Sequence, residues 1–386
     1  KGMKMSKSKG NAVDPFAIME KHGADAVRWY MFVNNPPWKP TLFNADDIAK
    51  TVISDFLRSL TNTYSFFAMY ANIDNYDRET PEIAIEKRPI IDRWIISRTY
   101  SLIQNYKKLM DEYELTKAHR AIQEFIIYEL SNWYIRRNRR RFWKGENDDE
   151  KIAAYQTLYF VLRQITVLIS SVAPFISEDL YQKLRKENDP LSVHLEKYPE
   201  CKTEYINEDL EHKMSMVQQI VYLARSLREK AKIRVRQPLQ RILIPIDSPV
   251  ERRNIMEFKD IILDELNIKE IEFIDENNSE VIKRKAKANF KVMGKKYGKL
   301  MKLAAEAIDK LTNTQIIQLE KEGHLEIEYH GEKFDFLTED VDIFSQDIEG
   351  WLVARENDLT IALDTSLNQS LINEGIAREF VSKIQN

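Results

Sequence analysis

The sequence predicts a mainly α-helical protein, in which an antiparallel helical bundle is followed by a smaller α+β domain. Glycine is scarce: the 386 residues include 10 glycines, where average usage would give roughly 27. Apolar residues recur at helical spacing from residue 46 onward, and shorter strand-like runs appear only after residue 190. These changes of pattern predict domains over residues 1–45, 46–200 and 201–386.

The first 45 residues begin with a lysine-rich segment and continue as a helix. Asp14 and Pro15 predict the start of this helix, because proline is favoured at the first helical position. Apolar side chains then recur at helical spacing as far as Phe32. Three prolines between residues 36 and 40 end the segment and mark a boundary.

The bundle is predicted to contain five helices joined by short polar loops. Each carries apolar residues along one face, which antiparallel neighbours can bury. Thr116 is the expected N-cap of the third helix, whose apolar residues extend as far as Trp133. The other predicted ranges are 46–67, 92–113, 152–169 and 174–184.

After Pro190 the pattern changes to that of an α+β domain. A helix is predicted from about Glu208 to Lys232, a second over 255–266, and a closing helix over 367–384. Runs rich in apolar and β-branched residues predict strands between these helices. The predicted strands are 239–246, 268–274, 325–329, 333–336, 341–344, 351–355 and 359–363.

The composition excludes several classes of site. A single cysteine, Cys201, excludes a disulfide framework and a zinc site made of cysteines, and the six histidines are scattered. The glycines form no phosphate-binding pattern of the P-loop or dinucleotide type. No apolar run reaches the roughly 18 residues of a membrane span. We therefore expect a soluble, cytoplasmic protein without a metal site. Since the first residue is Lys1 rather than Met, we also expect a piece of a longer chain.

The net charge of −3 is the sum of segments with opposite charge. Residues 283–302 include nine basic side chains and no acidic one. Residues 303–386 include 18 acidic and 6 basic side chains, a net charge of −12. Basic surfaces attract polyanions and acidic surfaces repel them, so this asymmetry predicts a polyanionic partner.

The most informative segment is residues 4–8, with the sequence KMSKS, which lies ahead of the capped helix. It is a cationic loop with two hydroxyl groups. Lysine ammonium groups suit a polyphosphate, because preorganised cations stabilise negative charge that develops during a reaction. An ordinary solvated lysine run is the alternative interpretation.

Residues 4–8 resemble the KMSKS signature loop of class I aminoacyl-tRNA synthetases, and residues 23–30 resemble the isoleucyl, valyl and leucyl group of that class. Three later segments resemble the isoleucyl branch that archaeal, eukaryotic and some bacterial enzymes share: residues 223–239, 289–299 and 371–380. The resemblance implies the part of such an enzyme from the KMSKS loop onward. Residues 1–45 would be the C-terminal edge of the catalytic domain, and the helical bundle would be the anticodon-binding domain.

The resemblance also implies a reaction and its catalytic residues, Lys4 and Lys7. Lys7 would bind the ATP phosphates and stabilise the transition state of adenylation, and Lys4 would support the loop or hold pyrophosphate. The ATP-binding residues would be Lys4, Met5, Ser6, Lys7 and Ser8. The full-length enzyme would use ATP with Mg²⁺ to make isoleucyl-adenylate and would then charge tRNA-Ile, as a monomer.

The 386 residues alone are expected to be inactive. In this family a His-Ile-Gly-His-type motif, the amino-acid pocket and the inserted editing domain lie upstream of the signature loop. The resemblance therefore implies that this chain serves mainly to bind the tRNA anticodon.

A second candidate site is an arginine-rich segment that follows Trp133. Arginine binds phosphate through two parallel hydrogen bonds, and aromatic rings stack on unpaired bases. In the family this domain binds the anticodon stem and loop, so the segment is expected to contact tRNA. In the alternative interpretation, Trp133 continues the core stripe and the arginines pair with carboxylates of the bundle. The candidate residues are Trp133, Arg136, Arg137, Arg139, Arg140 and Arg141.

A third basic segment lies at the end of the helix that begins near residue 208. It is predicted to contact the RNA backbone, which would make binding strongly dependent on salt. A solvated helix face is the alternative, and both interpretations also apply to residues 283–302. The candidate residues are Arg225, Arg228, Lys230, Arg234 and Arg236.

Two other functions stay open at this point. A valyl- or leucyl-type synthetase fragment would share the signature loop, and a non-catalytic RNA-binding module could reuse the anticodon domain. The KMSKS loop argues against the second, because a pure RNA-binding module has no use for lysines that bind ATP phosphates.

Overall fold

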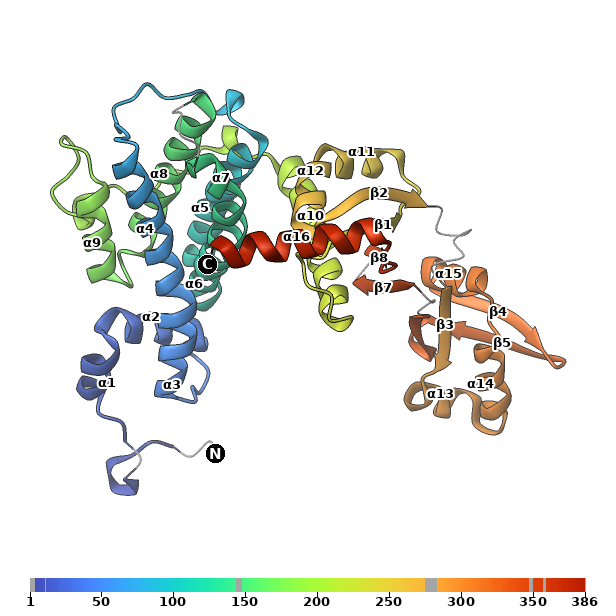
Figure 1. Ribbon diagram of the computed structural model, residues 1–386. Helices are drawn as coiled ribbons and strands as arrows, with labels where there is room; N and C mark the ends of the chain where they lie inside the picture. The colour runs from blue at the N-terminus through green and yellow to red at the C-terminus, as the bar shows by residue number, and fades with distance from the viewer. Residues whose placement is uncertain are drawn as a thin grey trace. The chain divides into compact units, whose positions relative to one another are not determined.

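The computed structural model describes residues 4–10, 12–143, 148–274, 283–346, 350–356 and 359–385. The chain divides into two compact units, Lys1–Glu211 and His212–Asn386. Figure 1 shows the helical first unit and the second unit, which combines helices with strands. The mainly α-helical class, with a smaller α+β part, is confirmed.

The N-terminal segment contains one short turn and two helices. A 3₁₀ turn η1 (Lys7–Lys9) precedes α1 (Pro15–His22) and α2 (Ala24–Asn34). The expected start is confirmed, since the Asp14 carboxylate accepts a hydrogen bond from the backbone N–H of Phe16 at 2.9 Å. The expected single helix is wrong, because Gly23 interrupts it with a φ of 85°, a conformation that glycine adopts without strain.

The bundle contains the five expected helical regions, two of which include π-helical turns. The first combines α3 (Ala45–Asp47), the π-helical η2 (Ile48–Leu57) and α4 (Arg58–Ile73), and the second is α5 (Ile90–Asp111). The others are α6 (Leu115–Glu124) with the π-helical η4 (Phe125–Ile135) and α7 (Arg136–Trp143), then α8 (Asp149–Ile169) and α9 (Pro174–Leu184).

The core of the bundle is aromatic and aliphatic. Trp29, Phe56 and Tyr134 are fully buried, and Trp29 stacks on Phe56 with 4.3 Å between ring centroids. Helix α8 packs against α4, α5, α7 and α9 (Figure 1). Among the described helices it alone is long and apolar enough to cross a bilayer, but 72% of that apolar window is buried inside the protein. It is therefore a core helix.

The second unit starts with α10 (Glu208–Lys230), whose first residues belong to the first unit, and is built around a four-stranded sheet in the order β2-β1-β8-β7. Strands β1 (Leu239–Pro245) and β2 (Ile268–Ile274) run parallel, whereas β8 (Leu359–Asp364) is antiparallel to β1 and to β7 (Trp351–Glu356). Between β1 and β2 lie α11 (Pro249–Glu257) and α12 (Lys259–Leu266). The one helix expected over 255–266 is thus two helices, separated at Phe258.

A smaller group of elements lies between β2 and β7. Strand β3 (Lys283–Ala288) pairs with β6 (Val341–Gln346), and β4 (His324–Tyr329) forms a hairpin with β5 (Glu332–Leu337). Helices α13 (Phe290–Tyr297), α14 (Met301–Asp309) and α15 (Asn313–Glu322) accompany them. Met293, Ile308 and Phe336 are buried in their common core.

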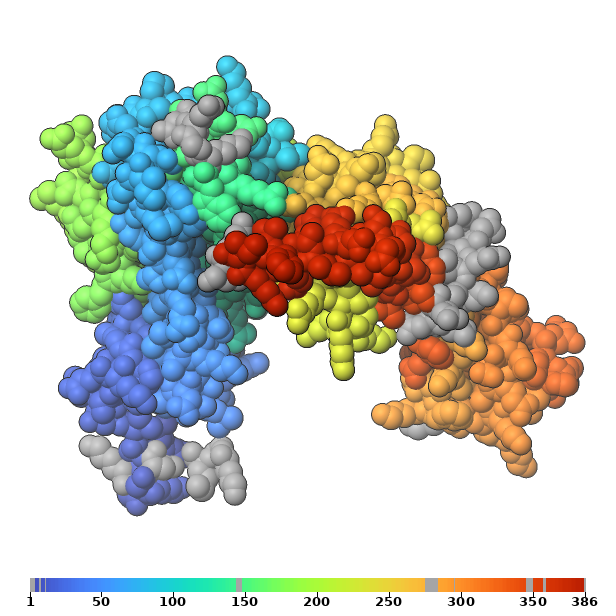
Figure 2. All heavy atoms as spheres, viewed as in Figure 1, coloured from blue at the N-terminus to red at the C-terminus, as the bar shows by residue number. Residues whose placement is uncertain are grey.

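The sequence did not predict strand β3, because its apolar alternation is hidden by charge. Arg284 occupies an inward position and is buried, where it forms an ion pair with Glu320 at 2.9 Å. Lys285 and Lys287 on either side of Ala286 are exposed. The closing helix, α16 (Gln369–Gln385), follows β8; Leu371 near its start is buried, whereas Ile376, Phe380 and Ile384 are exposed on the surface that Figure 2 shows for this helix.

Candidate nucleic-acid interface

The KMSKS segment is an exposed loop held by its own hydroxyl groups. The Ser6 and Ser8 hydroxyl oxygens lie 3.0 Å apart, and the backbone N–H of Lys9 donates to the Ser6 hydroxyl at 3.3 Å. Lys4 and Met5 face solvent. The backbone of Lys7 belongs to the turn η1, but its side chain lies outside the described residues. The loop thus presents hydroxyl and ammonium groups to solvent.

The arginine-rich segment is α7 together with the end of η4, and its residues divide into two groups. Trp133 is 6% exposed and belongs to the core, as the alternative interpretation expected. Arg139 and Arg140 are exposed, and Arg136 and Arg137 are half-buried. The backbone carbonyl of Asn132 accepts a hydrogen bond from Arg136 Nε at 3.0 Å.

Arg141 points into the bundle instead of toward solvent. Its Nη1 and Nη2 atoms donate to the two carboxylate oxygens of Asp92 at 2.7 and 2.8 Å. The Tyr134 hydroxyl donates to the same carboxylate at 2.8 Å, and Asp92 is completely buried. Burial, together with the Asp92 charge, raises the pKa of Tyr134 well above its ordinary value. Burial alone would lower the pKa of Arg141, but the hydrogen bonds and charge of Asp92 raise it. Arg141 thus anchors α7 to α5, and this use of the side chain does not fit the predicted RNA contact.

Helix α7 ends in an exposed aromatic residue, Trp143, that is not among the residues predicted from the sequence. Trp143 is 59% exposed, in contrast to the buried Trp133. It follows the exposed Arg139 and Arg140 within one helical turn. The only sequence signal for this difference is that Trp143 falls outside the apolar stripe that ends in Trp133.

The third basic segment also divides between interior and surface. Arg228 is 1% exposed and donates to the backbone carbonyls of Leu266 at 2.6 Å and Gln237 at 2.9 Å, so it serves the fold and does not fit the predicted RNA contact. Burial lowers its pKa to about 10. Arg225 forms an ion pair with the nearly buried Glu265. The exposed members are Lys230, Arg234 and Arg236, and the last two lie 3.4 and 3.7 Å from the Glu379 carboxylate.

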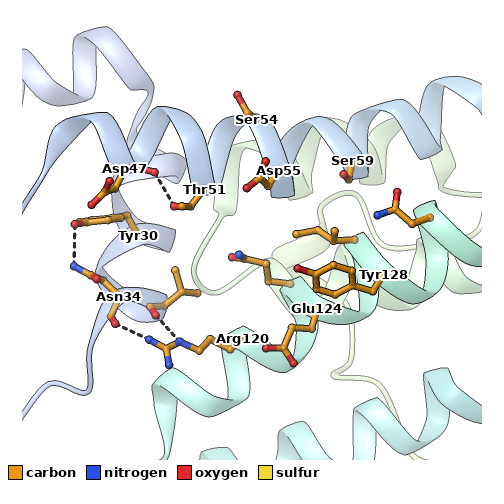
Figure 3. A pocket seen from close by; sticks show the side chains of 14 residues that line it. Tyr30, Asn34, Asp47, Thr51, Ser54, Asp55, Ser59, Arg120, Glu124 and Tyr128 are labelled. Carbon is orange, nitrogen blue, oxygen red and sulfur yellow. Dashed lines mark hydrogen bonds between the residues drawn. The ribbon is translucent and has the colours of Figure 1, made fainter. Parts of the chain in front are cut away.

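The first unit also contains a pocket of about 730 Å³ between α2, η2 and the α6–η4 helix (Figure 3). Three carboxylates line it, from Asp47, Asp55 and Glu124, along with serine, threonine and tyrosine hydroxyls. Its one cation, Arg120, is already used on backbone carbonyls of α2 (Figure 3). Carboxylates repel phosphate, so the pocket does not suit an RNA backbone.

No group of three or more His, Cys, Asp or Glu side chains that could hold a metal ion occurs in the part of the chain that the structure describes. Among the candidate RNA-binding residues that the structure describes, those exposed are Arg139 and Arg140 of α7 in the first unit, and Lys230, Arg234 and Arg236 in the second. Guanidinium and ammonium groups beside an exposed indole ring are the side chains with which proteins contact single-stranded RNA.

Comparison with known proteins agrees with this chemistry. Residues 92–243 match the anticodon-binding domain of tRNA ligases, and residues 1–40 match the class I tRNA synthetases of the I, L, M and V group. The chain therefore belongs to the class I tRNA synthetases. Within that class it is a homologue of the isoleucine–tRNA ligases, to which it is similar over its whole length.

The chain is 43% identical over 388 residues to the isoleucine–tRNA ligase of Bacteroides fragilis, and 45% identical to that of Cytophaga hutchinsonii. Each alignment covers 100% of this chain but 34% and 35% of the respective relative. The chain thus spans about a third of the length of these relatives. A solved methionyl-tRNA synthetase of Mycobacterium tuberculosis matches 48% of the chain and 37% of its own, at 24% identity and a TM-score of 0.42.

Proposed function

We propose that this chain is the part of an isoleucine–tRNA ligase from the KMSKS loop onward, and that its task is to bind tRNA-Ile and to supply the loop to ATP. The identity of 42–45% to isoleucine–tRNA ligases over the entire chain carries the proposal. The complete enzyme condenses isoleucine with ATP, releases pyrophosphate, and passes the isoleucyl group from the adenylate to the 3′ end of the tRNA. It acts in the cytoplasm as a monomer.

The signature loop supports the first step of that reaction. Lys4 and Lys7 supply ammonium groups for the phosphates of ATP, and Ser6 and Ser8 supply hydroxyl donors. A bound Mg²⁺ ion would neutralise further phosphate charge. The loop can contribute because negative charge builds up on the departing pyrophosphate, where a nearby cation lowers the barrier. In this proposal residues 1–45 are the edge of the catalytic domain, 46–200 the anticodon-binding bundle, and 201–386 an accessory α+β domain.

Helix α7 supports anticodon binding. Arg139 and Arg140 are exposed and suited to phosphate, and Arg136 and Arg137 are partly exposed beside them. Trp143 offers a ring on which an unpaired base can stack, which is worth about 1–3 kcal/mol per base. In the second unit, Lys230, Arg234 and Arg236 offer further phosphate contacts.

The test is a tRNA-binding measurement with charge reversal. In the 386-residue chain, Arg139→Glu with Arg140→Glu should weaken binding of a tRNA-Ile transcript about tenfold or more at 0.15 M salt. The dependence of log Kd on log salt should become shallower by roughly one to two units, because each phosphate contact contributes 0.7–0.9. The matched control is Lys107→Glu with Lys108→Glu, which makes the same charge change on an exposed part of α5.

Equal affinity in the arginine variant and the lysine control would reject α7 as the RNA surface. Activity is tested separately, with the complete enzyme. It should charge tRNA-Ile with isoleucine, and preferential charging with valine or leucine would assign the chain to a sister enzyme instead.

A further inference from the structure

Residues 23–30 include two charged side chains, Asp25 and Arg28, that belong neither to the ATP loop nor to the proposed RNA surface. Asp25 lies in the first turn of α2 and is 8% exposed. Its carboxylate accepts hydrogen bonds from the backbone N–H groups of Ile176 at 2.7 Å and Phe175 at 3.4 Å. Both N–H groups lie in the first turn of α9, where the helix dipole favours a negative charge. Asp25 therefore caps a helix of the bundle.

Arg28 makes the complementary contact one turn further along α2. Its Nε donates to the carbonyl of Val172 at 2.9 Å, and its Nη2 donates to the carbonyl of Ser171 at 3.0 Å. These carbonyls follow the C-terminal end of α8, where a cation is favoured. Asp25 and Arg28 thus bind the two ends of the turn between α8 and α9. The carboxylate of Asp25 meets the N-terminus of α9, and the guanidinium of Arg28 meets the carbonyls that follow α8.

A third contact runs in the opposite direction, from the bundle to α2. Arg120 of α6 donates to the carbonyls of Val33 and Asn34 at 2.7 and 2.6 Å, at the C-terminal end of α2 (Figure 3). Between the charged contacts, Trp29 is fully buried and its indole N–H donates to the Gln123 side chain at 3.0 Å. Both ends of α2 are therefore fixed to the bundle by charged groups, and its middle by a buried ring.

Helix α2 follows the KMSKS loop in the chain with only helix α1 between them. The loop leads into α1, whose last turn is closed by the Gly23 N–H on the Met19 carbonyl at 2.8 Å, and α2 begins at the next residue. On its pocket side α2 meets polar groups, including Arg120. The capping contacts on the α8–α9 turn, the contacts of Arg120 and the buried Trp29 ring together hold α2 to the bundle.

We propose that Asp25, Arg28 and Arg120 are positioning residues for adenylation: they set the place of the KMSKS loop by fixing α2 to the RNA-binding bundle. This inference rests on the proposed function. It has a distinct kinetic consequence, because in this proposal the three residues act on the reaction only through the loop. A displacement of about 1 Å in a catalytic group can cost on the order of 100-fold in rate.

The experiment uses the complete enzyme with Asp25→Asn and Arg28→Gln, each assayed by isoleucine-dependent pyrophosphate exchange. We expect kcat to fall tenfold or more, while KM for isoleucine and Kd for tRNA-Ile stay within about twofold. Asp25→Glu and Arg28→Lys, which keep the charge, should recover part of the lost kcat. The matched controls are Asp46→Asn and Arg58→Gln, whose side chains are exposed on the neighbouring α3–α4 helix.

A second readout is independent of catalysis. In the 386-residue chain, amide hydrogen exchange over residues 4–10 and 15–22 should speed up in Asp25→Asn and stay unchanged in Asp46→Asn. The proposal would be overturned if the Asp25 and Arg28 variants kept the kcat and the amide hydrogen exchange of the wild type. It would also be overturned if only KM for isoleucine changed. If the wild-type complete enzyme lacked isoleucine-dependent exchange, the proposed function would fail, and the amide-exchange result would still decide whether the three residues hold the loop segment. Should Asp25→Asn not fold, Asp25→Glu supplies the same comparison.

Discussion

At the scale of single residues, the arginines of the two basic segments fall into two groups: some hold the fold together, and others face solvent. Arg228 is buried and Arg141 is largely buried, and both are hydrogen-bonded to groups of the protein, whereas Arg139 and Arg140 face solvent. Removing the partner of a buried guanidinium lowers the stability of the fold, because the charge is then shielded from water and has no hydrogen-bond acceptor in its place. The buried arginines should therefore control stability, and the exposed ones should control binding.

Asp92 offers the sharpest test of this division. Asp92→Asn removes the charge that holds Arg141 and should lower the free energy of unfolding by about 3–5 kcal/mol. Urea denaturation followed by circular dichroism measures the change. The control is Asp179→Asn, which breaks an exposed ion pair with Lys183. It should lower the free energy of unfolding by less than about 1 kcal/mol. A similar loss in both variants would mean that burial does not set the value of these pairs.

A pH effect is expected from His119. The side chain is fully buried between Tyr106 and the carbonyl of Leu115, and burial lowers its pKa. In the unfolded chain this histidine takes up a proton at a pH of about 6.5, whereas in the folded protein it does so only at a lower pH. Stability should therefore be intact above that pH and decline as the pH falls, by at most about 1.4 kcal/mol per unit.

His119→Asn should remove this part of the slope, and His194→Asn, at an exposed histidine, should leave it unchanged. Unfolding free energies measured at intervals between pH 7.5 and 5 supply the comparison. Parallel curves for the wild type and His119→Asn would contradict the assignment.

At the scale of elements, α16 is held to its sheet domain by an unusually close contact. Gly375 lies where the Gln237 side chain crosses the helix, and a Cβ atom there would be 2.3 Å from Gln237 Oε1. Gln237 cannot simply move away, because its Nε2 donates to the Leu371 carbonyl at 2.8 Å. Beyond this contact the helix is mostly exposed, including Phe380 and Ile384. A single glycine thus decides how closely α16 approaches the loop after α10.

Gly375→Ala should destabilise the protein by about 1–3 kcal/mol, because the added methyl group displaces Gln237. Gly294→Ala is the matched control: it too lies within a helix, with nothing within 4 Å of an added Cβ, and should stabilise the protein by up to about 1 kcal/mol through helix propensity. Thermal unfolding measures both. Adding Gln237→Ala to Gly375→Ala should recover part of the loss, and failure to do so would assign the cost to another contact.

How far the sequence predicts such elements depends on the kind of signal. Helical periodicity located the bundle helices, and β-branched runs located most strands, because each pattern reflects burial of one face. Charge patterns did less well. Arg140 and Arg141 are equivalent in the sequence, but one residue turns the side chain by about 100°, toward an Asp92 that is 49 positions away. For the two tryptophans the only signal is the apolar stripe, which includes Trp133 and leaves out Trp143; the packing of the bundle buries the first and exposes the second. Strand β3 escaped detection for the same reason, since Arg284 occupies an inward position with a distant partner.

At the scale of the whole molecule, the proposed function separates tRNA binding from the chemistry of adenylation. It has the signature loop but no His-Ile-Gly-His string in its 386 residues. We therefore expect the chain to bind tRNA-Ile without supporting isoleucine-dependent pyrophosphate exchange. The measurement is the exchange of labelled pyrophosphate into ATP, with the complete enzyme as the positive reference. Exchange above background by the 386 residues alone would refute this expectation.

The docking of α2 has a consequence for how such enzymes can be recombined. Without α2, the bundle would expose the apolar surface that Trp29 covers, as well as the first turn of α9 and the Arg120 guanidinium. A crossover near the codon for residue 45, at the boundary that the prolines predict, would therefore separate α2 from the helices that it packs against. When anticodon-binding bundles are exchanged between synthetases, we therefore expect the hybrid to fold only if α2 is transferred together with the bundle.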